Sequence, residues 1–276
     1  NWTLPLAMFA GAIGYFLLAN VTILEPAKPF VNWLIAVLTP FLIFAQLLLT
    51  FCKIEPKELL PKAWHVWLLS IQAVSSGIIA LLLIFCPMEE AYRDIFEGAM
   101  VCLICPTATA AAVITGKLGG SASTLTTYTL LSNVLAAIAV PLVFPLVEPH
   151  ADITFVVAFL KILSKVFPLL LAPFFIALLF RYYIPSVHRL LSKYHGVAFY
   201  LWAVALTIVT GQTVRSLVTA AADVSIEIMI ALAGLATCCL QFYFGKRIGS
   251  AYHDRISAGQ ALGQKNTVLA IWMAVT

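Results

Sequence analysis

The segment Gly263-Gln-Lys-Asn-Thr-Val-Leu-Ala-Ile-Trp-Met-Ala274 decides how this chain is interpreted, because it places one cation, Lys265, inside an apolar run. The nearest carboxylate in the sequence belongs to Asp254. An ionisable side chain at membrane depth costs several kcal/mol unless a partner or water compensates its charge, so it indicates a functional site. The alternative is that the helix is short and that the long lysine side chain reaches the membrane interface.

The composition of the whole chain places this segment in a lipid bilayer. Hydrophobic residues make up 62% of the 276 residues, charged residues only 10%, and the mean hydropathy is +1.01. Such a composition leaves too little polar surface for a soluble domain. A membrane helix needs about 20 apolar residues. The sequence predicts an all-α polytopic membrane protein with nine such spans, at 2–20, 31–52, 63–86, 95–117, 122–147, 153–181, 194–214, 225–245 and 256–276.

The charges of the connecting segments predict the orientation, because Lys and Arg gather on the cytoplasmic side of a membrane protein. One side holds ten of the sixteen basic residues, namely Lys53, Lys57, Lys62, Lys117, Arg181, Arg189, Lys193, Lys246, Arg247 and Arg255. That side has only the acids Glu55, Glu58 and Asp254, whereas the other has Glu25, Glu89, Glu90, Asp94, Glu97, Glu148, Asp152, Asp223 and Glu227. We therefore expect a multi-pass protein of the cell inner (plasma) membrane with a cytoplasmic N-terminus. The basic balance reflects this topology and predicts no nucleic-acid partner.

Nine spans leave the end of the sequence in mid-pattern, so we expect a tenth helix that is missing from this chain. Ten helices divide into two halves of five, 1–147 and 148–276, which insert with opposite orientations as an inverted repeat. A weak internal echo supports this division, because Gln72 lies in the third span and Gln241 in the eighth.

Two spans at corresponding positions of these halves carry helix-breaking residues. The fourth span is interrupted near Pro106, and the ninth is loosened near Gly259 and Gly263. Unwound backbone at membrane depth is tolerated only where it is buried in protein or lines a cavity, so paired breaks indicate a transporter binding site. We expect the two broken helices to cross near the membrane midplane. The alternative is that Pro106 merely kinks its helix.

Motifs in the broken spans resemble the bile acid:sodium symporter family. Cys105-Pro-Thr-Ala-Thr-Ala-Ala-Ala-Val-Ile-Thr115, with the turn Gly119-Gly120, resembles the fourth helix of the family, in which Cys-Pro-Gly-Gly-Thr-Ala-Ser-Asn-Val is usual. Gln260-Ala-Leu-Gly-Gln-Lys-Asn-Thr-Val-Leu-Ala270 resembles its ninth helix, and Gly245-Lys-Arg-Ile-Gly249 loosely fits its eighth. The resemblance implies a panel domain of helices 1, 2, 6 and 7 and a core domain of helices 3–5, 8 and 9. It also implies an organic-anion substrate between the two domains.

The sequence departs from the family at the positions that, by this resemblance, bind sodium. One sodium site of the family uses a Ser-Asn pair on helix 4 and a Glu on helix 9, where this chain has Ala111, Ala112 and Ala261. Methyl groups cannot coordinate sodium, which needs several oxygen ligands. At the second site Gln72 is retained, but the Glu is again Ala261 and a Gln is replaced by Lys265. The sequence therefore predicts no cofactor, and it predicts an ammonium in the volume of the second ion.

The predicted substrate and ion site consists of polar residues around this lysine. Its members are Lys265, Asn266, Gln264, Thr267, Gln260, Gln72, Thr107, Thr109, Thr115, Thr129, Ser132 and Asn133, with helix breaks at Pro106 and Gly263. Helix N-termini near Thr107 and Asn266 would add positive ends that attract an anion. The hydroxyls of the fifth span have an equally good alternative role as helix-packing residues.

Two mechanisms follow from a lysine in the cavity. In the first, Lys265 stays protonated and pairs with an anionic substrate, which makes transport sodium-independent. In the second, desolvation favours the neutral amine while the site is empty, and binding of the anion draws in a proton. A further alternative is a sodium-coupled bile acid symporter with one residual site, in which Gln260 supplies part of the missing carboxylate.

Other function classes find less support in the sequence. We expect no enzyme, because the buried positions carry no Ser/His/Asp set, no His-Glu-x-x-His motif and no phosphate loop. An ion/proton antiporter of related fold needs an intramembrane carboxylate, and none lies near Lys265. A non-transporting sensor would also lack the ion ligands. We rank alternating-access transport of an organic anion first, bile-acid-like or another carboxylate, ahead of the antiporter and the sensor. The six cysteines show no disulfide spacing and are interpreted as core residues.

Overall fold

The computed structural model is helical throughout most of the residues that it describes, which are 2–53, 57, 59–149, 153–193, 196–219 and 224–274. Four acids of the charge comparison lie outside these described residues, namely Glu55, Glu58, Asp152 and Asp223.

Seven helices of the described part are long and apolar enough to cross a membrane. They are α1 (Thr3–Asn20), α2 (Lys28–Cys52, which follows the 3-10 helix η1, Thr22–Ala27), α3 (Ala63–Phe85), α6 (Ala122–Val147), α7 (Phe155–Tyr183), α9 (Val197–Thr219) and α10 (Val224–Ala251). Large apolar side chains such as Phe9 and Phe85 are exposed on their surfaces, which suits contact with lipid. The chain is therefore a polytopic helical membrane protein.

The fourth and ninth predicted spans are each divided into two shorter helices. The fourth forms α4 (Glu90–Ile104) and α5 (Ala111–Lys117), and the ninth forms α11 (Arg255–Gly263) and α12 (Thr267–Ala274). This division explains why seven long helices stand where nine spans were expected. A further short helix, α8 (Pro185–Lys193), follows α7.

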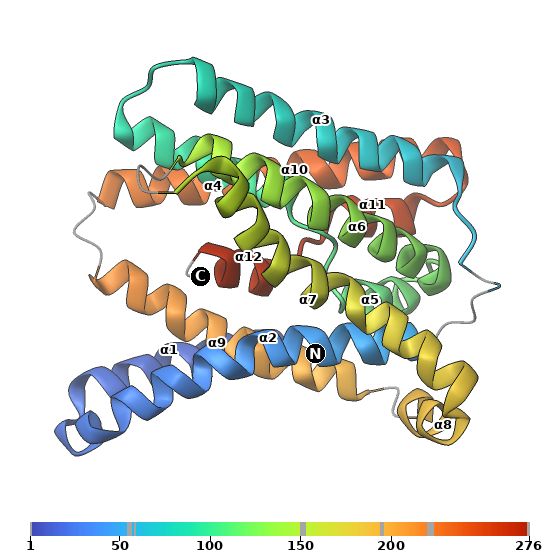
Figure 1. Cartoon of the computed structure of the whole chain (residues 1–276), viewed down its shortest axis with the longest axis horizontal. Coiled ribbons are helices and arrows are strands. Elements are labelled where there is room, and N and C mark those ends of the chain that lie inside the picture. The colour runs from blue at the N-terminus through green and yellow to red at the C-terminus, as the bar shows by residue number, and fades with distance from the viewer. Residues whose placement is uncertain are drawn as a thin grey trace.

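Figure 1 shows the helices in two groups with α12 between them. α1, α2 and α9 pack together and α7 lies against α2, while on the other side α3, α4, α10 and α11 pack with one another. α6 contacts helices of both groups, α3 and α7 among them. α12 contacts α2 and α9 on one side and α4 on the other, so the second half of the broken ninth span lies where the groups meet.

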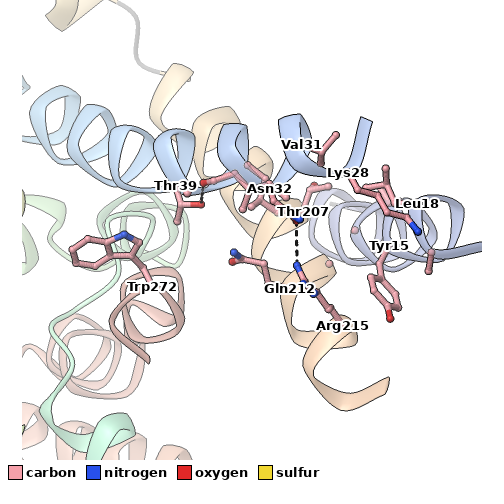
Figure 2. A pocket seen from close by; sticks show the side chains of 18 residues that line it. Tyr15, Leu18, Lys28, Val31, Asn32, Thr39, Thr207, Gln212, Arg215 and Trp272 are labelled. Carbon is pink, nitrogen blue, oxygen red and sulfur yellow. Dashed lines mark hydrogen bonds between the residues drawn. The ribbon is translucent and has the colours of Figure 1, made fainter. Parts of the chain in front are cut away.

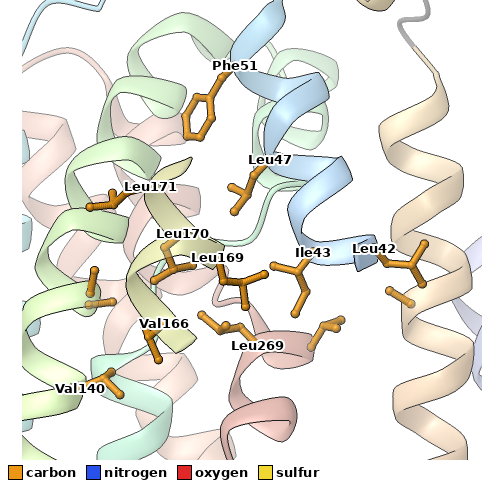
Figure 3. Packing of buried hydrophobic residues seen from close by; sticks show 14 of the residues in the cluster. Leu42, Ile43, Leu47, Phe51, Val140, Val166, Leu169, Leu170, Leu171 and Leu269 are labelled. Carbon is orange, nitrogen blue, oxygen red and sulfur yellow. The ribbon is translucent and has the colours of Figure 1, made fainter. Parts of the chain in front are cut away.

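A buried apolar cluster holds α2, α7 and α12 together (Figure 3). Ile43 and Leu47 of α2 meet Leu170 of α7 and Leu269 of α12, and each of these side chains is almost completely buried. Lipid tails are as apolar as leucine, so this cluster stabilises the fold through close van der Waals packing rather than through exclusion from water.

Small residues bring two helix pairs into close contact. A Cβ at Gly11 of α1 would overlap the backbone oxygen of Thr207 of α9. In the other pair, a Cβ at Gly245 of α10 would lie 2.5 Å from the backbone oxygen of Ala258 in α11, and one at Gly249 would lie 2.6 Å from the Ala258 Cβ. The glycine-rich segment of the eighth span therefore serves the α10–α11 contact.

Backbone conformation and limited space explain the two glycines in the turn between α5 and α6. Gly119 has a φ of 83°, a conformation that residues with a Cβ rarely adopt. A Cβ at Gly120 would lie 2.7 Å from the Thr115 Cγ2. Ser121 then caps α6, because its hydroxyl accepts from the Thr124 N–H at 3.3 Å.

Two sequence interpretations need correction. Gly259 lies inside α11, so the ninth span is unwound only after Gly263. The glycine serves packing, because a Cβ at this position would lie 2.7 Å from the Lys246 Cγ. The cysteines are not all core residues, because Cys86 and Cys239 are exposed.

Candidate functional site

The breaks in the fourth and ninth spans lie side by side and complete each other's backbone hydrogen bonding. Three pairs of residues join them: Thr107 with Lys265 as an antiparallel bridge, the Ala108 N–H with the Gln264 carbonyl (2.9 Å), and the Asn266 N–H with the Pro106 carbonyl (2.9 Å). Unpaired backbone groups inside a membrane are costly, so this pairing allows both helices to unwind at the same place.

Thr107 adds side-chain contacts to this crossing. Its hydroxyl donates to the backbone oxygen of Ala261 in α11 at 2.7 Å, and its N–H donates to the hydroxyl of Ser132 in α6 at 3.3 Å. Thr107 is completely buried. It therefore fixes the unwound part of the fourth span against both α11 and α6.

Gln72 of α3 caps the broken end of α4. Its amide nitrogen donates to the carbonyls of Ile104 (3.0 Å) and Cys105 (3.2 Å), which α4 leaves without helical partners. Its amide oxygen accepts from the hydroxyls of Tyr128 and Ser132, both at 3.2 Å. Carbonyls can only accept, so the nitrogen must face them and the orientation of the amide is determined. Other groups of the protein thus occupy both the donor and the acceptor positions of the Gln72 amide.

The ammonium of Lys265 is buried at this crossing and has no hydrogen-bond partner among the described residues. The residue as a whole is only half-buried. Cys102 and Cys105 of the fourth span lie within electrostatic range of the ammonium. Gln72 does not pair with it, since both ends of that amide are occupied. The lysine therefore presents an unpaired donor inside the protein.

Further buried polar atoms in the described part also lack partners. They include the oxygens of Gln264 and Gln241, the hydroxyl of Thr115 and both amide atoms of Asn133. Buried polar groups are normally hydrogen-bonded, so unpartnered atoms point to water or a ligand as the missing partner.

The three alanines that replace sodium ligands lie in an apolar cluster. Ala111 and Ala261 are completely buried and Ala112 is nearly so. Their neighbours in the cluster are Trp64, Leu68, Leu125, Tyr128, Ala258 and Leu262. A sodium ion needs several oxygen ligands, and the methyl groups of these three alanines supply none.

The other residues of the predicted substrate and ion site differ in their burial and in their hydrogen-bond partners. Asn266 caps α12, because its side-chain oxygen accepts from the Leu269 N–H at 3.1 Å. Thr129 is buried, and its hydroxyl donates within α6 to the Leu125 carbonyl. Gln260 is half-buried and Thr267 is exposed, so these two face away from the most enclosed part of the crossing.

Sequence reasoning missed Gln46 of α2. The Thr109 hydroxyl in the unwound fourth span donates to the Gln46 side-chain oxygen at 2.8 Å, and the Gln46 amide nitrogen is buried without a partner. The residue links α2 to the crossing. An amide in the apolar run of α2 was the signal that could have revealed it.

A sequence model of the sodium bile acid symporter family matches residues 12–220, which include the break between α4 and α5 but not Lys265. No curated protein matches the chain. The family match covers well over half of the sequence, and it confirms the resemblance drawn from the broken spans. The chain belongs to the sodium bile acid symporter family.

Proposed function

We propose that this protein is a secondary transporter of an organic anion, bile-acid-like or another carboxylate, and that Lys265 replaces sodium as the positive charge of the binding site. The observation that carries the proposal is the buried Lys265 ammonium, which has no hydrogen-bond partner among the described residues at the crossing of two unwound helices. A fixed positive charge in such a position calls for a negative partner. A substrate carboxylate would supply this negative charge and accept a hydrogen bond from the Lys265 ammonium.

We infer sodium independence from the side chains at the positions that bind sodium in the family. Ala111, Ala112 and Ala261 offer no oxygen from their side chains, and Gln72 uses its own oxygen for two hydroxyls. No step of the proposed mechanism therefore involves sodium. The remaining amide and hydroxyl groups near the crossing, such as those of Gln264 and Thr115, would bind polar parts of the substrate or bridging water.

Alternating access is proposed to be a movement between the two helix groups. We assign α1, α2, α7 and α9 to the panel and α3–α6, α10, α11 and α12 to the core. The mutual packing of α1, α2 and α9 and that of α3, α4, α10 and α11 support this division, while α6 and α12 contact helices of both groups. The repeated pairing of a long helix with a broken one, α3 with α4 and α10 with α11, supports an inverted repeat over 1–147 and 148–276. Rocking of the panel against the core would expose the crossing to each side in turn.

The orientation is part of the proposal. Lys62 pairs with Asp254 at 3.1 Å where α3 and α11 begin, and the positive-inside rule places this end in the cytoplasm of a cell whose plasma membrane holds the protein. The N-terminus would then also be cytoplasmic. Cys86, exposed at the far end of α3, tests this. A variant with Cys86 as its only cysteine should react with a membrane-impermeant maleimide added outside intact cells, and reaction only after lysis would reverse the orientation.

The function is tested by uptake of cholate into proteoliposomes. We expect equal uptake with sodium or choline outside and a loss of uptake in Lys265→Met. Lys161→Met, which removes an exposed cation of α7, is the matched control and should transport normally. An absolute need for sodium, or full activity of Lys265→Met, would overturn the proposal. An imposed pH gradient decides the coupling, because stimulation by outside acid indicates a carried proton and indifference indicates facilitated transport.

A further inference from the structure

A cavity lies away from the crossing, among α1, α2 and α9. It has a volume of about 740 Å³ and is lined by residues of these three helices and by Trp272 of α12 (Figure 2). Small residues such as Gly14 of α1 and Ala36 of α2 make room for it. The volume falls within the range of about 300–1,000 Å³ that is typical of small-molecule sites.

Two cations mark one region of this cavity. Arg215 of α9 donates to the side-chain oxygen of Asn32 at 3.1 Å and has no ion pair with a carboxylate among the described residues. Lys28, at the start of α2, is half-buried and lies 3.5 Å from the exposed carboxylate of Glu25. Two positive charges thus stand against one exposed carboxylate, so the described residues leave this region with a net positive charge.

The walls of the cavity combine an apolar surface with one unused polar atom. Val31 and Ile35 of α2 and Ile208 of α9 form apolar wall, and the indole of Trp272 lies at the end away from Lys28 (Figure 2). The side-chain oxygen of Gln212 is buried without a hydrogen-bond partner. It lies one helical turn before Arg215 on the same face of α9, so both can reach one ligand.

The cavity and the crossing both involve residues of α2. Thr39 lines the cavity, and Gln46, which bonds Thr109 at the crossing, follows seven residues later on α2. Seven residues of α-helix correspond to about 10 Å. A ligand in the cavity would therefore lie close to the crossing. Lys265 is not among the residues that line the cavity.

We propose that this cavity is a second anion site, which binds an amphipathic anion by pairing its acidic group with Arg215 and Lys28 and its apolar part with the wall formed by Val31, Ile35 and Ile208. The occupant is either a free carboxylate on its way to the crossing or the acidic headgroup of a phospholipid. Both share the same chemistry, an acid on an apolar chain. Binding here does not depend on whether Lys265 takes part in transport.

The test measures binding of radiolabelled dodecanoate to the protein in phosphatidylcholine nanodiscs. The Lys265→Met variant is used as background, so that only the second site is observed. We expect saturable binding that dodecanol does not displace. In this background Arg215→Gln and Lys28→Gln should each weaken binding about ten-fold or more, because each removes a charge-assisted contact. Arg247→Gln, which removes an exposed charge of α10 outside the cavity, should bind as the background does.

The outcomes separate this proposal from the proposed function. Absence of saturable binding, equal displacement by dodecanol, or equal weakening by Arg247→Gln would overturn the second site. Loss of dodecanoate affinity when phosphatidylglycerol is added identifies the occupant as lipid, and unchanged affinity identifies it as a free anion; both results support the site. A Lys265→Met protein that transports normally yet binds dodecanoate through Arg215 would refute the proposed function alone.

Discussion

Replacing Lys265 by methionine should make the protein more stable and, at the same time, weaken its binding of anions. Methionine keeps the unbranched shape of the side chain and removes the buried ammonium, which has no hydrogen-bond partner in the described part of the structure. A lysine at the centre of a membrane helix costs about 2.5–3.5 kcal/mol on insertion scales. Part of that penalty is already relieved by local packing, so we expect a gain of about 2 kcal/mol in the ligand-free protein.

The size of both effects can be measured. A gain of about 2 kcal/mol corresponds to roughly 4–8 °C in the unfolding temperature of a chain of this size. A lost hydrogen bond to a charged group costs about 1.5–3 kcal/mol, which weakens anion affinity by about ten-fold or more. Thermal unfolding of purified protein gives the first quantity, and its shift with added cholate gives the second.

Lys161→Met separates these effects from a general loss of charge, because Lys161 is an exposed residue of α7. It should leave both the unfolding temperature and the cholate-induced shift near those of the parent protein. A Lys265→Met protein that is less stable than the parent would show that the ammonium has a structural partner. A variant with an unchanged cholate shift would show that the anion does not meet this lysine, and either result would refute the reasoning.

Three further predictions concern the scaffold and can be checked by thermal unfolding. Gln72→Ala should lower stability by about 2–4 kcal/mol, because two buried carbonyls of the α4 end lose their donor; an unchanged unfolding temperature would mean that water replaces the amide. Ala261→Glu should lower stability by about 3 kcal/mol or more and should not make cholate uptake sodium-dependent, because it forces a carboxyl group into a packed apolar cluster. Gly11→Ala should separate α1 from α9 and lower stability by about 1–3 kcal/mol, whereas Gly14→Ala, whose Cβ would meet nothing within 4 Å, should be tolerated; equal effects of the two would contradict the close contact.

The sequence predicted the membrane class and the long helices because hydropathy alone determines where apolar segments of sufficient length lie. The breaks were harder to locate. Pro106 lacks the N–H that a helix interior needs, so the sequence signal and the observed end of α4 at Ile104 agree closely. Glycine is a weaker signal. Gly259 lies within α11, where its missing side chain leaves room for Lys246, and the ninth span is unwound only at the residues after Gly263.

Residue type did not predict which partners the polar side chains have. Gln72 was expected near the second ion and Lys265 in the volume of that ion, yet the structure gives Gln72 the carbonyls of α4 as partners and leaves the ammonium without one. One amide can bind a metal, a hydroxyl or a helix end, and only the fold decides which of these lies within 3 Å. Gln46 was missed for the same reason, because its partner Thr109 is distant in the sequence.

The sodium independence that we propose rests on the packing around Gln72 as well as on the substituted ligands. An ion at the second site would need the Gln72 oxygen, but this oxygen already accepts from Tyr128 and Ser132. Turning the amide to free it would deprive the carbonyls of Ile104 and Cys105 of their donor. A carboxylate restored at Ala261 would therefore face a lysine and an occupied amide. Recovery of sodium-coupled uptake would require Lys265, Ala261 and the contacts of Gln72 to change together, and recovery by Ala261→Glu alone would contradict this account.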